Sequence, residues 1–308
     1  MKKLICIVGP TASGKTALAV RLAGAIGSEV ISADSMQIYR YMDIGTAKPS
    51  MQERGGVVHH MLDILDPGES YSAAQYALDA GACADALLAK GIVPIVAGGS
   101  GLYLDSLIGT LHYEPEPDHG ALRAELYAQA EAEGDAAMHA RLAALDPESA
   151  ARLHENDRRR ILRALEICLL TGEKASERAR RAAETPRRYE TLKLGLSWPR
   201  ETLYKRIDLR VQAMFDAGLV EEARTIYERF PSPTARQAIG YKELFAYFEG
   251  RISLAEAQEN IARESRRYAK RQISWLGRDG EVIFLDAADA DNLYKSALQY
   301  VCDFVSFE

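Results

Sequence analysis

The stretch of the chain with the clearest chemical potential is the run from Gly9 to Thr16, which reads GPTASGKT and fits the pattern G-x-x-x-x-G-K-[ST]. In this pattern the backbone N–H groups of a glycine-rich loop and the N-terminus of the next helix form a cradle for phosphate. Lys15 adds a positive charge, and the hydroxyl of Thr16 is a predicted ligand of Mg²⁺. The residues predicted to bind a diphosphate or triphosphate are Gly9, Pro10, Thr11, Ala12, Ser13, Gly14, Lys15 and Thr16.

The residues on either side of this loop supply the expected context. Residues 3–8 form an apolar run typical of a buried strand, and Leu18 and Leu22 lie four positions apart, as in a helix packed on a sheet. This succession distinguishes a phosphate site from a glycine-rich turn that matches by chance. Most such loops hold ATP or GTP, but any diphosphate with a metal ion fits, so other residues must indicate the reaction.

Two further polar side chains each follow a short apolar run, Asp34 directly and Ser100 after two glycines. Ligands of open parallel sheets lie beyond the carboxyl ends of the strands, so we expect the phosphate loop, Asp34 and Ser100 to meet at one edge. A carboxylate there can act as a general base, although spacing alone equally allows a helix cap or a Mg²⁺ ligand. Asp63 and Asp66 follow another apolar run and are weaker candidates for metal ligands.

The charge distribution points to a polyanionic partner. The chain carries a net charge of −6, yet residues 152–210 hold 16 Lys or Arg against 9 Asp or Glu. Residues 158–160, all arginine, open a predicted helix, where positive charge opposes the helix dipole unless a phosphate backbone binds there. The alternative is a solvated basic face with intramolecular partners. A second basic run, 265–272, with Tyr268 and Trp275 nearby, suits either RNA stacking or a helix core.

These candidate residues need a framework to position them. Short apolar runs predict strands, the stretches between them predict helices, and their alternation indicates a parallel sheet. We therefore expect an α/β protein with a P-loop NTPase-like core. The expected strands are 3–8, 29–34, 59–67, 92–97 and 191–198, with an edge strand at 282–285. The expected helices are 17–23, 72–90, one from 102, one from 200, 237–248 and 254–275.

Two proline-containing breaks divide this pattern, at residues 112–118 and 184–188. Between them the periodicity is entirely helical. We expect an all-helical domain at 114–188, inserted into a core formed by 1–113 and 189–308.

Composition narrows the class of protein. The 308 residues are 47% hydrophobic, which suffices for one large or two modest globular domains. No apolar run approaches the roughly 18 residues of a membrane span, and the run behind Met1 is too short for a signal peptide. The four cysteines lack C-x-x-C spacing, so we expect reduced thiols and no zinc site. These features predict a cytoplasmic protein without a membrane partner.

Taken together, the motifs resemble the bacterial tRNA dimethylallyltransferase (tRNA isopentenyltransferase) family. The matching stretches cover most of the chain in order: GPTASGKT at 9–16, ISADSMQIYRYMDIGTAKP at 31–49, HHMLDILDPGESYSAAQY at 59–76, VAGGSGLYL at 96–104, NDRRRILRALEI at 156–167, QAIGYKEL at 237–244 and YAKRQISWL at 268–276. The resemblance implies transfer of a dimethylallyl group from dimethylallyl diphosphate to the exocyclic amine of the adenosine 3′ of the anticodon, with release of diphosphate. It further implies Mg²⁺ as cofactor and the tRNA anticodon stem-loop as partner, and we expect a monomer.

The resemblance also implies roles for single residues that match the family's motifs. Asp34 matches the family's general base, and Ser100 stands where the family usually has threonine. Lys15 and Arg210 match the residues that hold the diphosphate. Arg210 lies ten residues into its predicted helix, about 15 Å along it, so a long reach or a helix tilt must bring it to the loop. Ser265 and Gly277 depart from the family pattern. The residues implied to contact tRNA are Asp34, Ser35, Met36, Gln37, Ser100, Arg123, Arg159, Arg160, Ile161, Leu162, Arg163, Gln237, Ala238, Ile239, Gly240, Tyr241 and Lys242.

Three alternatives use the same loop. An adenylate (free nucleotide) isopentenyltransferase differs only in its acceptor. A P-loop small-molecule kinase or NTPase is disfavoured because the sequence has no N-K-x-D segment and no clear Walker B strand. A non-catalytic RNA-binding module is disfavoured because it gives the phosphate loop no function.

Overall fold

The computed structural model describes residues 2–109, 120–230 and 237–306. Contacts divide the chain into two compact units, Met1–Ile108 with Arg188–Glu308, and Gly109–Arg187. We call them the core unit and the helical unit and describe each by itself. The domain boundary predicted at residue 188 falls beside the junction between Arg187 and Arg188, whereas the one predicted at residue 114 lies outside the described residues.

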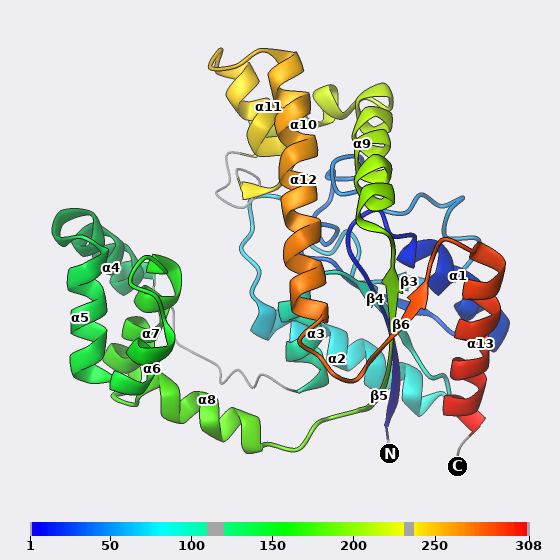
Figure 1. Cartoon of the computed structure of the whole chain (residues 1–308), viewed down its shortest axis with the longest axis horizontal. Helices are drawn as coiled ribbons and strands as arrows, with labels where there is room; N and C mark the ends of the chain where they lie inside the picture. Colours follow the sequence, from blue (N-terminus) through cyan, green and yellow to red (C-terminus); the bar gives the residue numbers. More distant parts are fainter. Residues whose placement is uncertain (1, 110–119, 231–236, 307–308) are drawn as a thin grey trace. The chain divides into compact units, whose positions relative to one another are not determined.

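Six strands form one sheet in the core unit, in the order β3-β2-β4-β1-β5-β6. Figure 1 labels β3, β4, β5 and β6 among them. Every neighbouring pair is parallel, so the carboxyl ends of all the strands lie at one edge. The predicted parallel sheet is thereby confirmed, including its edge strand. The strands are β1 (Lys3–Val8), β2 (Val30–Ala33), β3 (His59–His60), β4 (Ile95–Gly98), β5 (Glu190–Ser197) and β6 (Val282–Asp286).

Strand β3 is shorter than the apolar pattern predicted, because the chain leaves the extended conformation directly after His60. Met61 and Asp63 have φ angles of 62° and 56°, in the left-handed region that residues other than glycine rarely adopt. The Asp63 carboxylate accepts a hydrogen bond from Lys48 at 2.5 Å. This contact joins residues 15 positions apart in the sequence. The pattern of apolar residues therefore could not predict where the strand ends.

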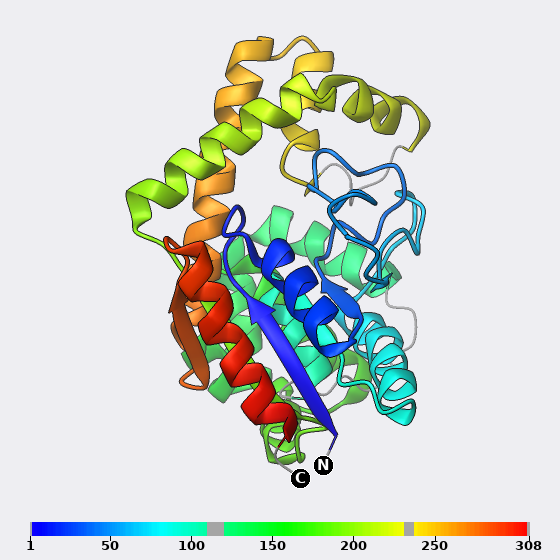
Figure 2. The ribbon, with the colours of Figure 1, turned by 90° about the vertical axis from the view of Figure 1, so that its right-hand side faces the viewer.

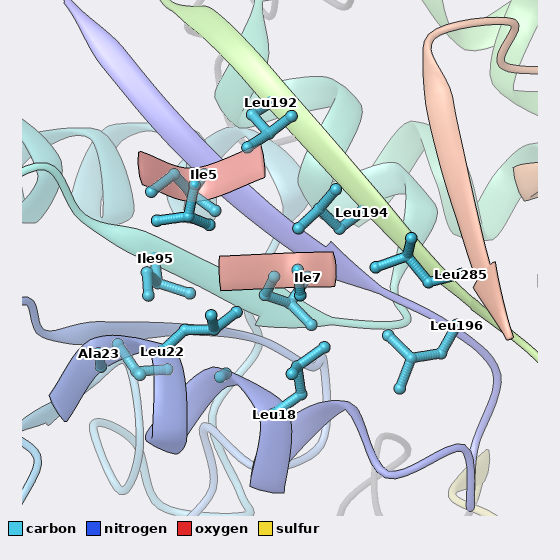
Figure 3. Close-up of a cluster of buried hydrophobic side chains, with 14 of the residues drawn as sticks. Ile5, Ile7, Leu18, Leu22, Ala23, Ile95, Leu192, Leu194, Leu196 and Leu285 are labelled. Carbon is cyan, nitrogen blue, oxygen red and sulfur yellow. The ribbon is translucent and has the colours of Figure 1, made fainter. Parts of the chain in front are cut away.

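Helices cover both faces of the sheet. Helices α1 (Lys15–Ile26) and α13 (Ala290–Ser306) lie on one face, and α2 (Ala73–Ala89) and α3 (Gly101–Ile108) on the other (Figure 2). As predicted, Leu18 and Leu22 of α1 join the buried cluster that contains Ile5 and Ile7 of β1 (Figure 3). Burial of each such side chain contributes about 1.5 to 3 kcal/mol. This packing fixes the start of α1, and with it the phosphate loop, at the carboxyl edge of the sheet.

Four more helices of the core unit share a second apolar cluster with the loop after β2. Ile38, Tyr39 and Met42 of that loop are buried against Leu219 and Tyr241. The loop has no periodic pattern in the sequence, yet its apolar side chains anchor it to the helices. These helices are α9 (Arg200–Asp216), α10 (Leu219–Arg229), α11 (Tyr241–Phe248) and α12 (Leu254–Leu276).

The helical unit has its own apolar core. Residues on the predicted helix faces, including Leu126, Met138, Leu142 and Leu165, form one buried cluster. Across the described residues, none of the helices in either unit combines the length and the apolar character needed to cross a bilayer. The helices of this unit are α4 (Gly120–Glu133), α5 (Asp135–Leu145), α6 (Pro147–Arg152), α7 (Arg158–Thr171) and α8 (Ala175–Glu184).

Candidate active site

The phosphate loop forms the tight turn between β1 and α1. Ala12 and Gly14 have φ angles of 63° and 94°, and a Cβ atom added to Gly9 would lie 2.7 Å from the Ser13 hydroxyl oxygen. Glycine is therefore needed at position 14 for its backbone conformation and at position 9 for close packing. Helix α1 begins at Lys15, so its first N–H groups, which have no partner within the helix, are available to an anion.

A pocket of about 990 Å³ opens beside the loop, within the core unit. Tyr268 of α12 lines it together with residues from β4 and α9. Of the residues predicted for the catalytic and diphosphate sites, Gly9, Pro10, Ser13 and Ser100 are not part of the lining in the described portion of the chain. The predicted residues that do line this pocket are Thr11, Ala12, Gly14, Lys15, Thr16, Asp34, Gln37 and Arg210.

Lys15 and Arg210 are two of the basic residues that line this pocket. The pKa of Lys15 is lowered to about 8, mainly by burial and also by the nearby charge of Arg210, while the Asp34 carboxylate opposes both effects. Burial also lowers the pKa of Arg210, again opposed by Asp34. Enclosed like charges are unfavourable unless an anion joins them, because few water molecules remain to solvate them. The pocket is thus electrostatically suited to a bound anion.

Three side chains hold the loop, two from helix α9 and one, Trp198, from the residue after β5. Arg210 donates a hydrogen bond to the Thr11 hydroxyl at 3.4 Å. One turn earlier, Arg206 donates to the carbonyl oxygen of Ala12 at 2.9 Å, and its guanidinium lies over the Trp198 ring. The indole N–H of Trp198 donates to the carbonyl oxygen of Ser13 at 2.9 Å. Arg206 and Trp198 were not predicted as site residues; the four-residue spacing of Arg206 and Arg210 on one helix was the available signal.

Asp34 lies at the end of β2 and turns back on its own segment. Its Oδ1 atom accepts a hydrogen bond from the Met36 N–H at 2.9 Å. The Ser100 hydroxyl oxygen accepts one from the Ser35 N–H at 3.1 Å. The sheet thus brings the segments after β2 and β4 together, as expected from the sequence, and Ser100 supports the backbone beside Asp34 from outside the pocket.

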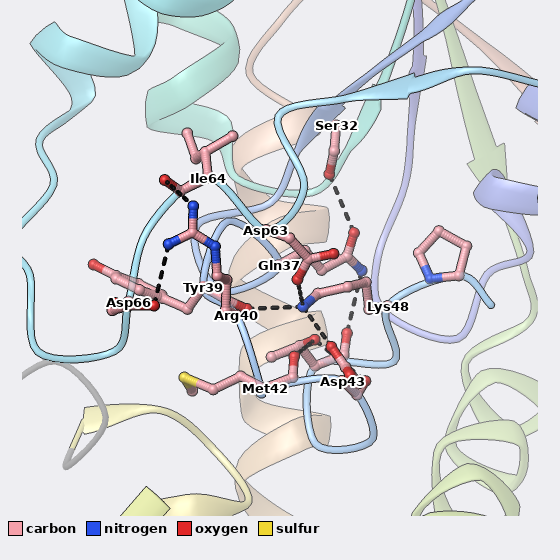
Figure 4. A network of polar contacts seen from close by, with 12 residues as sticks. Ser32, Gln37, Tyr39, Arg40, Met42, Asp43, Lys48, Asp63, Ile64 and Asp66 are labelled. Carbon is pink, nitrogen blue, oxygen red and sulfur yellow. Dashed lines mark hydrogen bonds and ion pairs between the residues drawn. The ribbon is translucent and has the colours of Figure 1, made fainter. Parts of the chain in front are cut away.

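The loop after β2 forms one wall of the pocket and is cross-linked by polar contacts (Figure 4). The Lys48 ammonium, only 3% exposed, donates to the carbonyl oxygen of Tyr39 at 2.8 Å and to Asp43 and Asp63 at 2.5 Å each. Gln37 donates to two carbonyl oxygens of the same loop. The candidate metal ligand Asp63 is therefore engaged by Lys48, and the other, Asp66, pairs with Arg40 at 3.1 Å.

Glu222 of α10 clamps the same loop from the other side. Its carboxylate accepts hydrogen bonds from the N–H groups of Asp43, Ile44 and Gly45 at 2.8 to 2.9 Å. It also accepts one from the Tyr241 hydroxyl at 2.6 Å, and a Cβ atom on Gly45 would lie 2.6 Å from the Tyr241 ring. The pocket wall therefore depends on a residue whose position in the sequence gave no indication of this role.

The residues at the start of α7 that were predicted to contact tRNA divide into surface and core positions. Ile161 and Leu162 are buried in the apolar cluster of the helical unit, so their side chains are not available to a partner. Arg159 and Arg160 are exposed, and Arg160 pairs with Asp157 at 3.4 Å. A second group forms around the buried carboxylate Glu166, which pairs with Arg123 at 2.8 Å and Arg163 at 3.3 Å. Part of this basic face is thus neutralised within the unit, as the alternative interpretation held.

The segment 237–242, also predicted to contact tRNA, contains both buried and exposed residues. Ala238 and Tyr241 are buried, whereas Gln237 is exposed. Gly240 has a φ angle of 98°, and the Lys242 ammonium lies 3.4 Å from Glu243.

The second basic run lies on α12 and contains both paired surface arginines and a residue that lines the pocket. Arg266 pairs with Asp208, and Arg267 with Glu264 at 2.7 Å. Tyr268 lines the pocket. Burial raises the pKa of its phenol to about 12, so it is a neutral hydrogen-bond donor near neutral pH.

Among the described residues, no group of three or more His, Cys, Asp or Glu side chains is arranged to hold a metal ion. Mg²⁺ commonly binds one or two protein oxygens and completes its shell with water and substrate phosphates. The Thr16 hydroxyl, which lines the pocket beside Lys15, fits that donor set.

The parallel sheet and its phosphate loop define a P-loop NTPase-like protein whose pocket is lined by Lys15, Arg210 and Asp34. A family model described as IPP transferase matches residues 37–279, and one described as isopentenyl transferase matches residues 2–64. The chain belongs to the tRNA dimethylallyltransferase family.

Relatives support this membership over nearly the full chain. A tRNA dimethylallyltransferase of Geobacter sulfurreducens is 48% identical, covering 97% of this chain and 96% of its own. One from Shouchella clausii is 43% identical, covering 98% and 97%. The crystal structure of a tRNA isopentenylpyrophosphate transferase from Bacillus halodurans is 39% identical with a TM-score of 0.74, covering 99% and 97%. A eukaryotic dimethylallyltransferase solved acting on tRNA is 31% identical with a TM-score of 0.86, covering 99% and 80%.

Proposed function

We propose that this protein transfers a dimethylallyl group from dimethylallyl diphosphate to the exocyclic amine of the adenosine 3′ of the anticodon in tRNA, releasing diphosphate. The observation that carries the proposal is the pocket in which Lys15 and Arg210 lie with Asp34 beside the phosphate loop. The names of the family's characterised members, including one solved acting on tRNA, support the same reaction.

Lys15 and Arg210 promote breaking of the C–O bond between the allyl group and diphosphate. An adenine exocyclic amine is a weak nucleophile, so the allyl carbon must become electrophilic as the C–O bond to diphosphate breaks. Negative charge then accumulates on the departing diphosphate, where Lys15, Arg210 and the loop N–H groups stabilise it. Burial lowers the pKa values of Lys15 and Arg210, and a bound anion favours the charged form of both groups, which supports diphosphate as the ligand.

The carboxylate acts on the bond that forms. As the amine nitrogen bonds to the allyl carbon, it becomes positively charged and must lose a proton, which Asp34 accepts as general base. The hydrogen bond from the Met36 N–H fixes the carboxylate, and Ser100 fixes the neighbouring backbone. The products are a neutral secondary amine on the base and free diphosphate.

Mg²⁺ is the proposed cofactor. Thr16 and the diphosphate oxygens would hold it. Its chemical contribution when bound is neutralisation of charge on the leaving diphosphate.

The tRNA is the proposed macromolecular partner. A base within a stacked anticodon loop must leave its stack to enter a pocket, at a free-energy cost of a few kcal/mol that contacts elsewhere on the RNA must offset. Arg159 and Arg160, exposed on α7, are suited to phosphate contacts. The proposed enzyme acts as a monomer in the cytoplasm.

Parallel incubations distinguish the proposal from its rivals. Protein, Mg²⁺ and labelled dimethylallyl diphosphate are mixed with tRNA or with AMP, and a separate sample receives ATP alone. We expect label in tRNA only. Label in AMP supports the free-nucleotide transferase, and phosphate release from ATP supports an NTPase or kinase.

A further inference from the structure

Gln272 of α12 connects two segments of the site that are far apart in the sequence. Its side chain is 6% exposed. The amide oxygen accepts a hydrogen bond from the Thr11 N–H of the phosphate loop at 2.8 Å. The amide nitrogen donates to the carbonyl oxygen of Gly99 at 3.0 Å. One buried side chain thus joins the phosphate loop to the turn after β4.

That turn is built to receive α12 on both sides of Ser100. A Cβ atom on Gly99 would lie 2.1 Å from the Gln272 amide nitrogen, and one on Gly101 would lie 2.4 Å from the Trp275 ring. The indole N–H of Trp275 donates to Asp105 at 3.1 Å. The glycines flanking Ser100 therefore provide room for α12, and the helix holds the turn in place.

The two ends of this connection belong to the two halves of the proposed reaction. Thr11 lies in the loop proposed to hold the leaving diphosphate and contacts Arg210. Ser100 supports the backbone beside Asp34. The Thr11 N–H donates its hydrogen bond to Gln272, so it does not donate to phosphate. Only the side chain of Thr11 is therefore left for the diphosphate site that the sequence predicted.

We infer that Gln272 is a positioning residue that sets the spacing between the diphosphate site and the catalytic carboxylate. The inference rests on the proposed function and extends it. A displacement of about 1 Å between reacting groups can reduce a rate by about 10²-fold. Loss of Gln272 should therefore lower turnover while leaving the binding of each substrate nearly unchanged.

The test compares Gln272→Leu and Gln272→Met, which keep the side-chain volume and remove both hydrogen bonds, with Gln258→Leu. Gln258 lies on the same helix, donates a hydrogen bond to the Gln212 side chain at 2.7 Å, and is not among the residues that line the pocket in the described portion of the chain. The measurements are kcat, KM for dimethylallyl diphosphate and for tRNA, and the melting temperature of each variant.

We expect kcat to fall about 10²-fold in both Gln272 variants, with both KM values within about threefold of wild type and Gln258→Leu unchanged. A folded Gln272 variant with kcat within threefold of wild type, or one that changes only KM, overturns the inference. If neither variant folds, the role is structural and the inference also fails. An inactive wild-type protein would instead contradict the proposed function itself.

Discussion

The Arg210 guanidinium lies 3.4 Å from the Thr11 hydroxyl and so joins helix α9 to the phosphate loop. Counting residues along an ideal helix placed Arg210 about 15 Å from the helix start and left its reach in question. The contact of Arg206 with the Ala12 carbonyl, one turn earlier, shows that α9 lies beside the loop from Arg206 to Arg210. Arg210 therefore reaches the loop from its position within the helix.

Replacement of Arg210 by glutamine should weaken binding of dimethylallyl diphosphate by about 10- to 100-fold, since hydrogen bonds to charged groups contribute about 1.5 to 3 kcal/mol. Calorimetric titration with inorganic diphosphate measures this loss. Arg200→Gln is the matched control, because Arg200 lies at the exposed start of the same helix and contacts Tyr204. Equal affinities for the two variants would remove Arg210 from the diphosphate site.

Replacement of Asp34 by alanine should lower turnover by roughly 10²- to 10⁴-fold, the usual contribution of a general base. The affinity for tRNA should change little, because the loop around Asp34 keeps its other contacts with Lys48 and Glu222. Asp66→Ala, which removes a surface carboxylate paired with Arg40, should leave turnover unchanged. Single-turnover rates provide the measurement, and near-normal turnover without Asp34 would exclude it as the base.

Binding of dimethylallyl diphosphate should take up protons above neutral pH. In the free protein, burial lowers the pKa of Lys15 to about 8, so the ammonium loses its proton as pH rises through 8. An anionic ligand favours the charged form and raises this pKa, which links binding to proton uptake and weakens binding at high pH. Calorimetry at pH 8.5 in buffers of different ionisation enthalpy detects the uptake. The effect should vanish in Lys15→Met, and its absence in wild type would contradict the proposed electrostatics.

Arg159 and Arg160 should contribute phosphate contacts to tRNA binding. Replacing both with alanine should weaken binding and reduce the slope of log K against log salt by about 1 to 2, as expected for the loss of two phosphate contacts. Arg181→Ala is the control, since Arg181 belongs to the same unit and pairs with Glu173. Filter binding across a salt series measures the slope. The same slope in the double variant and wild type would mean that these arginines form only a solvated face.

The helical unit should depend on the buried carboxylate of Asp146. It accepts hydrogen bonds from the N–H and hydroxyl groups of Ser149 and Ser176 at 2.6 to 3.1 Å. Asp146→Ala leaves these donors without their partner and should destabilise the unit by about 3 kcal/mol or more. Hydrogen exchange of the helical unit measures the loss, and unchanged protection factors would contradict it.

These hydrogen bonds, outweighing the opposing effect of burial, lower the pKa of Asp146 from 3.8 to about 2. A carboxyl whose pKa is lower in the folded state stabilises the protein fully above its unfolded pKa. This contribution should therefore be present at neutral pH and lost as pH falls from about 4 through 2, and the alanine variant should lack that part of the acid transition.

Local patterns in the sequence predicted the elements that depend on local physics. The phosphate loop, the parallel sheet and the meeting of the segments after β2 and β4 at its edge follow from apolar runs, glycine spacing and the rule for open sheets. The order of the strands and the contacts of Arg210 required the folded chain, because they join segments that are far apart in sequence.

The residues that hold the site together were missed for the same reason. Lys48, Glu222 and Gln272 each make several hydrogen bonds to residues distant in the sequence or in a loop without periodicity. Nothing in their local spacing separates them from ordinary surface residues. The loop after β2 is ordered by these contacts rather than by periodicity, which explains why the sequence showed a loop there but not its role as a pocket wall.

Nucleoside mass spectrometry of tRNA incubated with the protein, Mg²⁺ and dimethylallyl diphosphate tests the proposed transfer most directly. We expect a new adenosine heavier by one dimethylallyl group, located 3′ of the anticodon, with one diphosphate released for each transfer. Unmodified adenosine with intact dimethylallyl diphosphate, or a dimethylallyl group at a different nucleoside, would contradict it.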